Sequence, residues 1–494
     1  MAIIQIHPAD NVAVTVEAVV HGQQLMMDQT RLLAQSDIDK GHKIALGDIA
    51  CGESVVKYGY PIGVATQNIR AGDWVHTHNL ATRLGEVLEY SYQPELKELA
   101  TLKPKTFQGY RRHDGRVGIR NEIWVIPTVA CVNRNSELIA HISAQRLSPE
   151  SGIDGIYEIK HPYGCSQMGD DHLATQRILA DLVNHPNAAA VLVLGLGCEN
   201  NHIEAFKRVL GNYDSDRVKF LEAQSVEDEI ETGVQLIHEL VRFAAKMKRE
   251  PCSAAELTVG LKCGGSDGFS GITGNPLVGD FSDKLIAMGG KSVLTEVPEM
   301  FGAETILMNR AVNEEVFQKI VRLINDFKQY FIAHNQTIYE NPSPGNKKGG
   351  ISTLEEKSLG CTQKGGSGDV VDVLAYGEPA TVQGLNLLSG PGNDSVAVTA
   401  LVASGCQLLL FTTGRGNPLG TVIPTVKIAT NTDLFKRKLN WMDFDAGRLL
   451  ANQSMEQLGD ELFDLVMEVA SGRQTKSEQM GFRDIAIFKN GVTL

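Results

Sequence analysis

The sequence contains no apolar run long enough to cross a membrane. Its longest apolar stretches, such as residues 188–196, fall short of the roughly 18–20 residues that a membrane span needs. The opening residues, MAIIQIHPADN, also lack the basic segment and apolar core of a secretory signal peptide. We therefore expect a cytoplasmic protein without a membrane partner.

Cysteine is sparse, and positive charge is not in excess. The eight cysteines lie between Cys51 and Cys406 without the dense spacing of a disulfide framework, which fits reduced thiols in a cytosol. The chain has 46 Lys and Arg against 59 Asp and Glu, a net charge of −13. Since phosphate groups are bound through basic surface, this balance argues against nucleic acid as a partner. An anionic substrate must then be held by locally gathered cations.

The rest of the composition is that of a large globular protein. With 43% hydrophobic and 21% charged residues, the 494-residue chain is neither disordered nor collagen-like. At roughly 100–200 residues per domain, its length predicts about two to four domains, each with a core of its own.

The pattern of apolar and polar residues changes twice along the sequence. Residues 1–80 contain short apolar runs separated by turn residues, which predicts a small β-rich domain. After a polar linker, residues 81–109, apolar strands alternate with segments of helical period over residues 110–494, which predicts an α/β region with a mainly parallel sheet. This region can divide further into subdomains at 110–350 and 351–494. The polar loops after its strands should meet at the carboxyl edge of the sheet, where open parallel sheets bind ligands.

Two histidines form a candidate metal-binding pair. His76 and His78 lie two residues apart at the end of a predicted strand, so both imidazoles would point to the same face and could share one metal ion. A third ligand must come from another segment, and Asp170 is our candidate, although an aspartate there can equally be a helix N-cap. Two histidines and a carboxylate suit ferrous iron or manganese. An isolated pair of this kind can also be two surface residues.

Glycine-rich loops and two cations indicate a site for a carboxylate. Gly264 and Gly265, in CGGSDG, can bring backbone N–H groups close to an anion. Lys364 in GCTQK supplies a point charge, and Arg415 in TGRG can form a bidentate clamp. Alternatively, these residues are turn glycines and solvated cations.

Several long motifs occur in one order along the chain. They are VHTHN at residues 75–79, HPYGCSQMGDDH at 161–172, GLGCENN at 195–201, CGGSDG at 263–268, EVPEMFGAE at 296–304, YENPSPGN at 339–346 and GCTQK at 360–364. With these motifs the chain closely resembles the altronate/galactarate dehydratase family over its full length. The resemblance implies an N-terminal SAF (β-clip) domain before a catalytic α/β region, and a ferrous iron or manganese cofactor. It also implies dehydration of a small sugar acid, D-altronate, to 2-dehydro-3-deoxy-D-gluconate in galacturonate breakdown.

Dehydration of a sugar acid sets the catalytic requirements. The enzyme removes the proton next to the carboxylate and expels the neighbouring hydroxyl, and a divalent metal ion can stabilise the charge of both events as a Lewis acid. His172 fits the general base by residue type. Glu199 or Asp171 could protonate the leaving hydroxyl if burial raises its pKa, and these roles can be exchanged. The product enol becomes a 2-keto acid by itself, so no redox cofactor is needed.

Other interpretations stay open. Cys165, Cys263 and Cys361 could hold an iron–sulfur cluster with one open iron, since strand-end cysteines can converge. The substrate could be galactarate or another sugar acid with a different hydroxyl configuration. A non-catalytic sugar-acid sensor or a nicotinamide-binding protein would also fit such a sheet. We also expect the chain to bind a second copy of itself and to form a homo-oligomer, namely a dimer.

Overall fold

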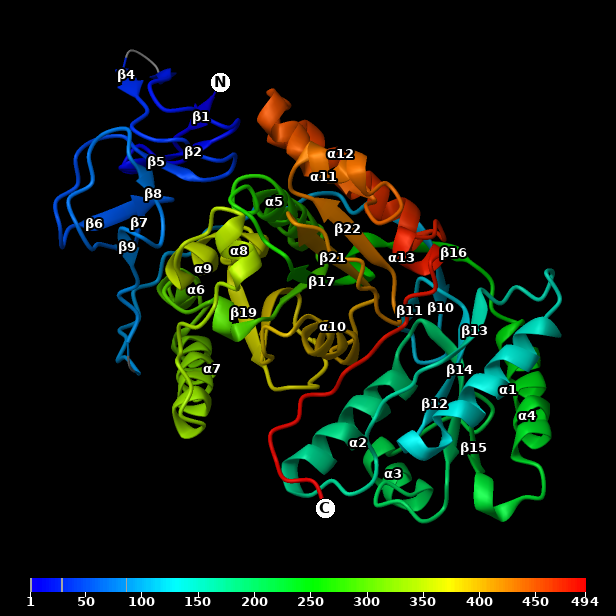
Figure 1. Ribbon diagram of the computed structural model, residues 1–494. Coiled ribbons are helices and arrows are strands. Elements are labelled where there is room, and N and C mark those ends of the chain that lie inside the picture. Colours follow the sequence, from blue (N-terminus) through cyan, green and yellow to red (C-terminus); the bar gives the residue numbers. More distant parts are fainter. Residues whose placement is uncertain (1, 28–29, 86) are drawn as a thin grey trace.

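The computed structural model describes residues 2–27, 30–85 and 87–494, which fold into three parts (Figure 1). A β-rich domain at the N-terminus is followed by a region with a four-stranded sheet and a region with a seven-stranded sheet. The strands of the seven-stranded sheet are all parallel, so the predicted fold class, a small β domain before a mainly parallel α/β region, is confirmed. None of the described helices is both long and apolar enough to span a membrane.

The N-terminal domain consists of short antiparallel strands. Its sheets have the orders β1-β2-β5-β8, β6-β7-β9 and β3-β4. The strands are β1 (Ile3–Ile4), β2 (Val12–Thr15), β3 (Gln24–Met27), β4 (Thr30–Leu33), β5 (Lys43–Ala45), β6 (Ser54–Lys57), β7 (Tyr60–Ala65), β8 (Trp74–Val75) and β9 (Leu80–Ala81). Val12, Val55 and Ile62 belong to an apolar core that also includes Ala303 and Leu359 of the large region. The domain therefore shares a core with the part that follows it.

A buried carboxylate joins the N-terminal domain to the large region. Glu356 lies in helix α9 (Leu354–Thr362) and contacts the ammonium groups of Lys43 and Lys57, each at 2.8 Å. All three side chains are at most 1% exposed. Charges removed from water to this degree are tolerated only when they are paired, so the two lysines require Glu356.

The segment between these parts follows the surface of the large region. Its described residues from 82 to 105 form neither helix nor strand. Tyr90 donates a hydrogen bond to Glu304 at 2.6 Å, and Tyr92 donates one to the carbonyl of Ala311 at 2.6 Å. The predicted linker is thus attached by specific contacts along its length.

The four-stranded sheet is parallel, with the order β13-β12-β14-β15. Its elements are β12 (Glu122–Pro127), α1 (Asn133–Gln145), β13 (Gly155–Glu158), α2 (Gly169–Asn184), β14 (Ala188–Gly195), α3 (Ile203–Leu210), β15 (Val218–Glu222) and α4 (Glu229–Ala244). Val125 packs with α1 and α4 on one face, whereas Trp124 packs with α2 and α3 on the other. Every residue of β14 is buried, as expected of a strand covered on both faces.

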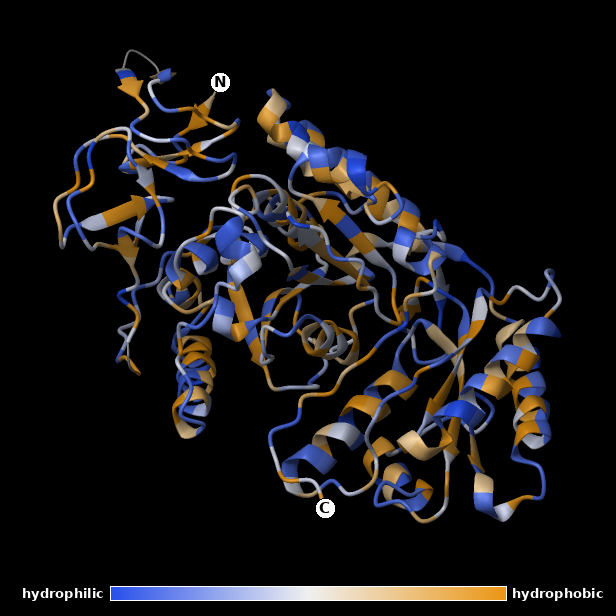
Figure 2. Cartoon of the chain, in the orientation of Figure 1, coloured by the Kyte–Doolittle hydropathy of each residue, from blue (hydrophilic) through white to orange (hydrophobic). Residues whose placement is uncertain are grey.

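The seven-stranded sheet has the order β19-β20-β18-β17-β21-β22-β23. Its strands are β17 (Thr258–Cys263), β18 (Lys291–Leu294), β19 (Val370–Leu374), β20 (Gly384–Leu388), β21 (Leu408–Thr413), β22 (Thr425–Ala429) and β23 (Phe444–Asp445). Strands from both sides of residue 350, where we predicted a division into subdomains, thus enter one sheet. Figure 2 shows that these strands are largely apolar, while the helices around them also carry hydrophilic residues.

Helices cover both faces of this sheet. Residues of α5 and α12 share one apolar core with it, and residues of α10 share another. The helices are α5 (Gly274–Ala287), α6 (Glu304–Met308), α7 (Glu314–Ala333), α8 (Pro344–Lys348), α10 (Asp394–Ala403), α11 (Thr432–Arg437), α12 (Met455–Ala470) and α13 (Lys476–Gln479). Short 3-10 turns are η1 (Ala130–Val132), η2 (Ala223–Ser225), η3 (Ala254–Glu256), η4 (Val297–Glu299), η5 (Gln363–Gly365) and η6 (Ala446–Ala451). A small antiparallel sheet, β11-β10-β16, is formed by β10 (Thr106–Arg111), β11 (Val117–Gly118) and β16 (Glu250–Ser253).

Two buried histidines brace the four-stranded sheet in their neutral form. His161 Nε2 donates to the carbonyl of Pro127 at 2.7 Å, and its Nδ1 accepts the N–H of Tyr163 at 3.2 Å. His185 Nε2 donates to the carbonyl of Cys406, just before β21 of the seven-stranded sheet, at 3.0 Å, and its Nδ1 accepts the N–H of Asn187 at 3.1 Å. Because one nitrogen donates and the other accepts, only the neutral ring satisfies both bonds. Burial lowers the pKa of His161 to about 4 and that of His185 to about 3.

Replacing Glu356 with Gln should destabilise the protein, because Lys43 and Lys57 would stay buried beside a neutral group. We expect the free energy of unfolding to fall by about 3–5 kcal/mol, the usual loss when one partner of a buried ion pair is removed. Urea unfolding followed by circular dichroism measures this. The matched control is Asp433→Asn, which breaks an exposed 2.6 Å ion pair with Lys40 between the same two parts and should cost less than about 1 kcal/mol. Equally small losses in both variants would contradict the proposed importance of Glu356.

The stability of the protein should fall as the pH drops from about 6.5 towards 4, because histidines of the unfolded chain take up protons in this range while His161 and His185 of the folded chain do not. This contribution is fully present above about pH 6.5 and is lost as the pH falls through the folded pKa values. Replacing both histidines with Gln keeps a hydrogen-bond donor and removes the titration, so the double variant should show a flatter profile. Urea unfolding at several pH values compares the two slopes. Parallel profiles would show that these histidines are not the cause.

Candidate functional site

Three ligand atoms meet at the carboxyl edge of the seven-stranded sheet. Cys263 Sγ lies 3.3 Å from Cys361 Sγ. Glu299 Oε2 lies 3.5 Å from the first sulfur and 3.0 Å from the second. All three residues are buried, and within the described residues they are the only group of three or more Cys, His, Asp or Glu whose ligand atoms lie within 4.8 Å of one another.

Neighbouring strands explain why residues distant in sequence meet here. Cys263 is the last residue of β17, and Glu299 belongs to η4, which follows the adjacent parallel strand β18. Glu296 precedes this turn in the left-handed region, with a φ of 74°. Cys361 comes from α9, a helix in which every residue is buried. The centre is therefore assembled from two strand ends and one internal helix.

Buried ion pairs surround the thiol of Cys263. Lys364 Nζ donates to Cys263 Sγ at 2.8 Å and to Glu296 Oε2 at 2.9 Å. Lys262 pairs with the same glutamate and, at 2.8 Å, with Asp394. Burial alone would lower the pKa of Lys364, but the charges of Cys263 and Glu296 outweigh it and raise the pKa well above its ordinary value. The same balance raises the pKa of Lys262, so both lysines keep their positive charge at neutral pH.

A further ion pair orients Glu299. Lys357 Nζ lies 2.7 Å from Glu299 Oε1, while Oε2 faces the thiols. Burial would raise the pKa of Glu299, but the surrounding ammonium groups, that of Lys357 first, hold it well below its ordinary value. The pKa of the Cys361 thiol is raised by its hydrogen bond with Cys263 and by burial. The centre thus places ionised carboxylates and thiols side by side.

The N-terminal domain closes this centre. A small cavity of about 10 Å³ beside Cys361 is lined by Lys57 and Tyr58 of that domain. A larger cavity of about 490 Å³ runs past α9, and its lining includes Tyr58, Tyr60 and Gln363. Because Tyr58 lines both cavities, the N-terminal domain contributes side chains to the surroundings of the centre.

The predicted anion-binding residues gather at this edge of the sheet, but most of their polar groups already have protein partners. Lys364 is engaged in the buried ion pairs. The N–H of Gly264 donates to the carbonyl of Thr412 at 3.0 Å, and the carbonyl of Gly265 accepts the N–H of Arg415 at 2.8 Å. The side chain of Arg415 is exposed. Contact of these residues with a substrate carboxylate stays a prediction.

One glycine of the same loop serves a contact between domains. A Cβ atom on Gly268 would lie 1.9 Å from the carbonyl oxygen of Gly41 in the N-terminal domain. No other residue fits such a close approach of two backbones. This part of CGGSDG is therefore explained by docking, whereas the sequence suggested a ligand loop.

The predicted metal ligands are not brought together. Residues 76–79 form a turn after β8, so His76 and His78 do not share a strand face. The His76 ring stacks on Trp74 with centroids 5.3 Å apart, and its Nδ1 lies 2.8 Å from Ser352 Oγ. His78 is exposed and lies against the same indole, with centroids 4.9 Å apart. Asp170 is exposed at the start of α2, on the other sheet, so metal binding by this set stays a prediction without support from the fold.

The residues predicted to transfer protons lie at the four-stranded sheet. Asp171 accepts the N–H groups of residues 490–491 at 2.8 and 2.7 Å and so holds the C-terminal segment. Glu199 accepts hydrogen bonds from Thr128, at 2.6 Å, and from two backbone N–H groups. Burial would raise its pKa, but these bonds lower it, so the condition that we set for a proton donor is not met. Burial lowers the pKa of His172, on α2.

The cysteine set predicted for a cluster is only partly assembled. Cys263 and Cys361 meet, whereas Cys165 precedes α2, which Figure 1 shows well away from α9. Their third neighbour is Glu299, which the sequence argument missed. A signal was present, because Glu296 and Glu299 follow a buried strand three residues apart, as two carboxylates of one strand-end loop.

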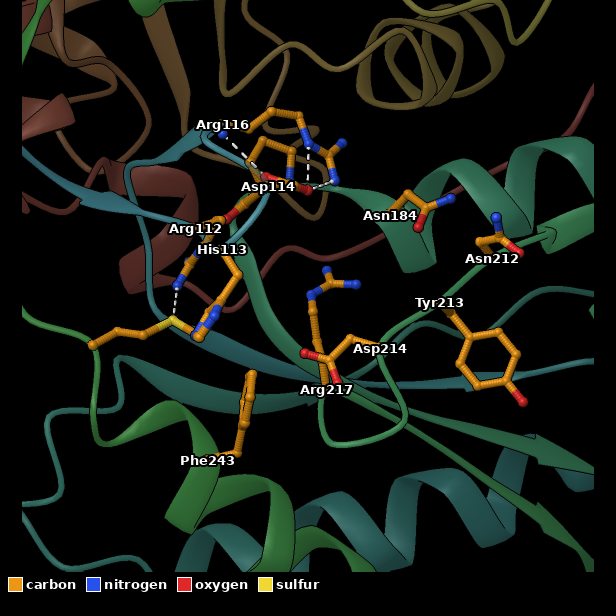
Figure 3. Close-up of a pocket in the computed structure, with 12 residues that line it drawn as sticks. Arg112, His113, Asp114, Arg116, Asn184, Asn212, Tyr213, Asp214, Arg217 and Phe243 are labelled. Atoms are coloured by element: carbon orange, nitrogen blue, oxygen red, sulfur yellow. Dashed lines mark hydrogen bonds and ion pairs between the residues drawn. The ribbon is translucent and has the colours of Figure 1, made fainter.

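A separate cavity lies at the amino end of the four-stranded sheet (Figure 3). Its volume is about 320 Å³, and its lining includes Arg112, Arg116 and Arg217. Arg112 and Arg217 donate to backbone carbonyls, and burial lowers their pKa to about 9 and about 10. Arg116 is paired with Asp114 at 2.5 Å. Arginines and aspartates thus line this cavity, whereas the thiols and carboxylates that suit a metal ion lie at the other sheet.

Three family models match the chain in succession. The altronate/galactarate dehydratase SAF domain matches residues 1–83, the second domain of D-galactarate dehydratase/altronate hydrolase matches 109–245, and the C-terminal domain of D-galactarate/altronate dehydratase matches 254–493. Together they cover most of the sequence.

Known enzymes are similar over their whole length. Altronate dehydratase of Escherichia coli (strain K12) is 53% identical over 100% of both chains, and that of Bacillus subtilis (strain 168) is 54% identical over 99% of both. Galactarate dehydratase (L-threo-forming) of Escherichia coli (strain K12) is 34% identical over 98% of this chain and 96% of its own. The chain therefore belongs to the altronate/galactarate dehydratase family and is a hydro-lyase.

Proposed function

We propose that this chain dehydrates D-altronate to 2-dehydro-3-deoxy-D-gluconate in galacturonate breakdown, with a divalent metal ion as cofactor. The observation that carries the proposal is the full-length similarity to two altronate dehydratases, at 53% and 54% identity. Galactarate is the second candidate substrate, because a galactarate dehydratase is 34% identical. The cytoplasmic location and the dimer stay predictions from the sequence.

The donor set of Cys263, Glu299 and Cys361 fits a metal ion. The surrounding ion pairs contain three lysines and three carboxylates, namely Lys262, Lys357, Lys364, Glu296, Glu299 and Asp394. Because these charges cancel, two thiolates would balance a divalent ion, and metal binding releases thiol protons. Sulfur donors favour ferrous iron over manganese. We propose these three residues as the ligands in place of His76, His78 and Asp170.

The chain's own residues hold charged ammonium groups at fixed positions in the centre. When bound, a divalent ion acts as a Lewis acid towards charge that develops on the substrate carboxylate and the leaving hydroxyl. Lys262 and Lys364 keep their ammonium groups in a buried centre, where charges interact more strongly than in water. Lys357 holds Glu299 with one oxygen towards the thiols.

We propose that the sugar acid binds in the cavity of about 490 Å³ beside α9. Its size lies within the range of about 300–1,000 Å³ that is common for ligand pockets. The hydroxyls of Tyr58 and Tyr60 and the amide of Gln363 are suitable partners for sugar hydroxyls. None of the three proposed ligands lines this cavity, but Thr362 and Gln363, the two residues that follow Cys361, do.

Metal-stripped full-length protein should form a 2-keto-3-deoxy acid from D-altronate when Fe²⁺ is added without oxygen. A product assay over D-altronate, galactarate and other sugar acids, with Fe²⁺, Mn²⁺, Mg²⁺ or no metal, measures this. We expect the highest kcat/KM for D-altronate with Fe²⁺ and little turnover without metal. A higher value for galactarate would favour the second candidate. Failure to convert any sugar acid would contradict the proposed activity and favour a sensor.

The variants Cys263→Ser, Cys361→Ser and Glu299→Gln should each weaken metal binding by at least about 10–100-fold. Mutation of a residue that only hydrogen-bonds to a metal ligand already causes a loss of about this size. Titration of sulfide-free protein with Fe²⁺ measures the affinity, and circular dichroism confirms folding. Cys51→Ser, an exposed thiol of the N-terminal domain, is the control and should bind like the wild type. If all three variants kept the wild-type affinity, the proposed ligands would be wrong, whichever substrate is turned over.

A further inference from the structure

Three exposed cysteines follow three neighbouring strands of the four-stranded sheet. Cys131 comes after β12, Cys165 after β13 and Cys198 after β14, and β12 pairs with both other strands. Because the strands are parallel, their loops share one carboxyl edge. Free cysteine is among the most buried residue types, so three exposed thiols at one edge indicate a purpose other than packing.

Direct hydrogen bonds hold the three loops together. The N–H of Ala130, next to the first cysteine, donates to the carbonyl of Tyr163 at 2.8 Å. The N–H of Ser166 donates to Asn200 Oδ1 at 2.9 Å, which reaches the loop of the third cysteine. Cys165 therefore lies in a loop that is bonded to the loops of both other cysteines.

The helices that follow these loops leave the edge on different faces. The helix after Cys131, α1, packs on the same face as α4, whereas α2 and α3 pack on the opposite face. The adjacent strands β12 and β14 thus form the switch point of this sheet. Open parallel sheets bind their ligands outside such a point.

Each cysteine also precedes the N-terminus of a helix. The helices α1, α2 and α3 begin at Asn133, Gly169 and Ile203, shortly after Cys131, Cys165 and Cys198. The partial positive charge of a helix N-terminus favours thiolates and anionic ligands. Three such ends directed at one edge suit a ligand held by several thiolates.

The separation of the three thiols bears on the kind of ligand. Neighbouring strands lie about 4.8 Å apart, so the outer strands β13 and β14 are separated by roughly 10 Å. A single zinc ion, with Zn–S bonds of about 2.3 Å, holds its thiolates less than about 4 Å apart. In the described chain the three thiols do not form a group with all atoms within 4.8 Å of one another. The three thiols are therefore not arranged for a single ion, whereas a cluster of several irons takes one thiolate at each iron.

We propose that Cys131, Cys165 and Cys198 bind an iron–sulfur cluster of the four-iron class. Each thiol loses its proton on binding and holds one iron. The fourth iron faces solvent, since all three cysteines are exposed, and is free to bind an oxygen ligand such as a carboxylate or a hydroxyl. The site belongs to a different sheet from Cys263, so the proposal does not depend on the proposed function.

The test uses full-length protein purified without oxygen, incubated with an iron salt, sulfide and a thiol reductant, and then desalted. We expect about four acid-labile sulfides per chain and about four irons beyond the one held at the Cys263 site, with absorbance at about 400 nm. Cys131→Ser, Cys165→Ser and Cys198→Ser should each lower the bound sulfide at least about fivefold, because each removes a ligand of the cluster. Cys51→Ser and Cys361→Ser are the controls and should keep both sulfide and absorbance. Circular dichroism confirms that every variant is folded.

The outcomes separate this site from the proposed function. Iron bound without sulfide, zinc bound in place of iron, or unchanged sulfide in the three variants would overturn the proposal. Loss of sulfide only in Cys361→Ser would also overturn it, because the cluster would then lie at the other sheet. A bound cluster in a protein that converts no sugar acid would support this site and count against the proposed function alone.

Discussion

Helix α9 carries charges that cannot reach water, and the arrangement of the molecule follows from this constraint. Every residue of α9 is buried, so each of its charged groups needs a partner. Glu356 takes two lysines from the N-terminal domain, and Lys357 takes Glu299 beside the thiols. The same helix supplies Cys361. One buried helix thus fixes both the docking of the N-terminal domain and the geometry of the candidate centre.

The sequence was most informative where a hydrophobic pattern was clear. The apolar stretch at residues 188–196 of the sequence contains strand β14, Ala188–Gly195. Helix α9 was not predicted, because a helix that is buried on all sides shows no polar face and no apolar stripe. Strand β22 was missed as well, since it is short and its apolar pattern is interrupted by Lys427. In the fold this lysine is buried, and its ammonium group lies 3.3 Å from the ring centroid of Phe411.

The sequence identified motifs that contribute to the candidate centre, but it did not identify the ion pairs between their side chains. Cys263, Cys361 and Lys364 all lie in the motifs CGGSDG and GCTQK, which the sequence analysis had singled out. Glu299 and Lys357 were missed, because glutamate and lysine are usually solvated and their pairing arises only when a strand end meets α9. The shared strand face expected for His76 and His78 does not form, since the side-chain alternation of a strand ends where the turn after β8 begins.

The ion pair between Lys57 and Glu356 also sets a waiting time during synthesis. The two residues are 299 positions apart. A ribosome adds about 5–20 residues per second, so the N-terminal domain waits about 15–60 s for the carboxylate that neutralises its lysines. During that interval the ammonium groups stay hydrated and keep the docking face polar. Until α9 has been synthesised, the docking face of the N-terminal domain is therefore charged rather than apolar.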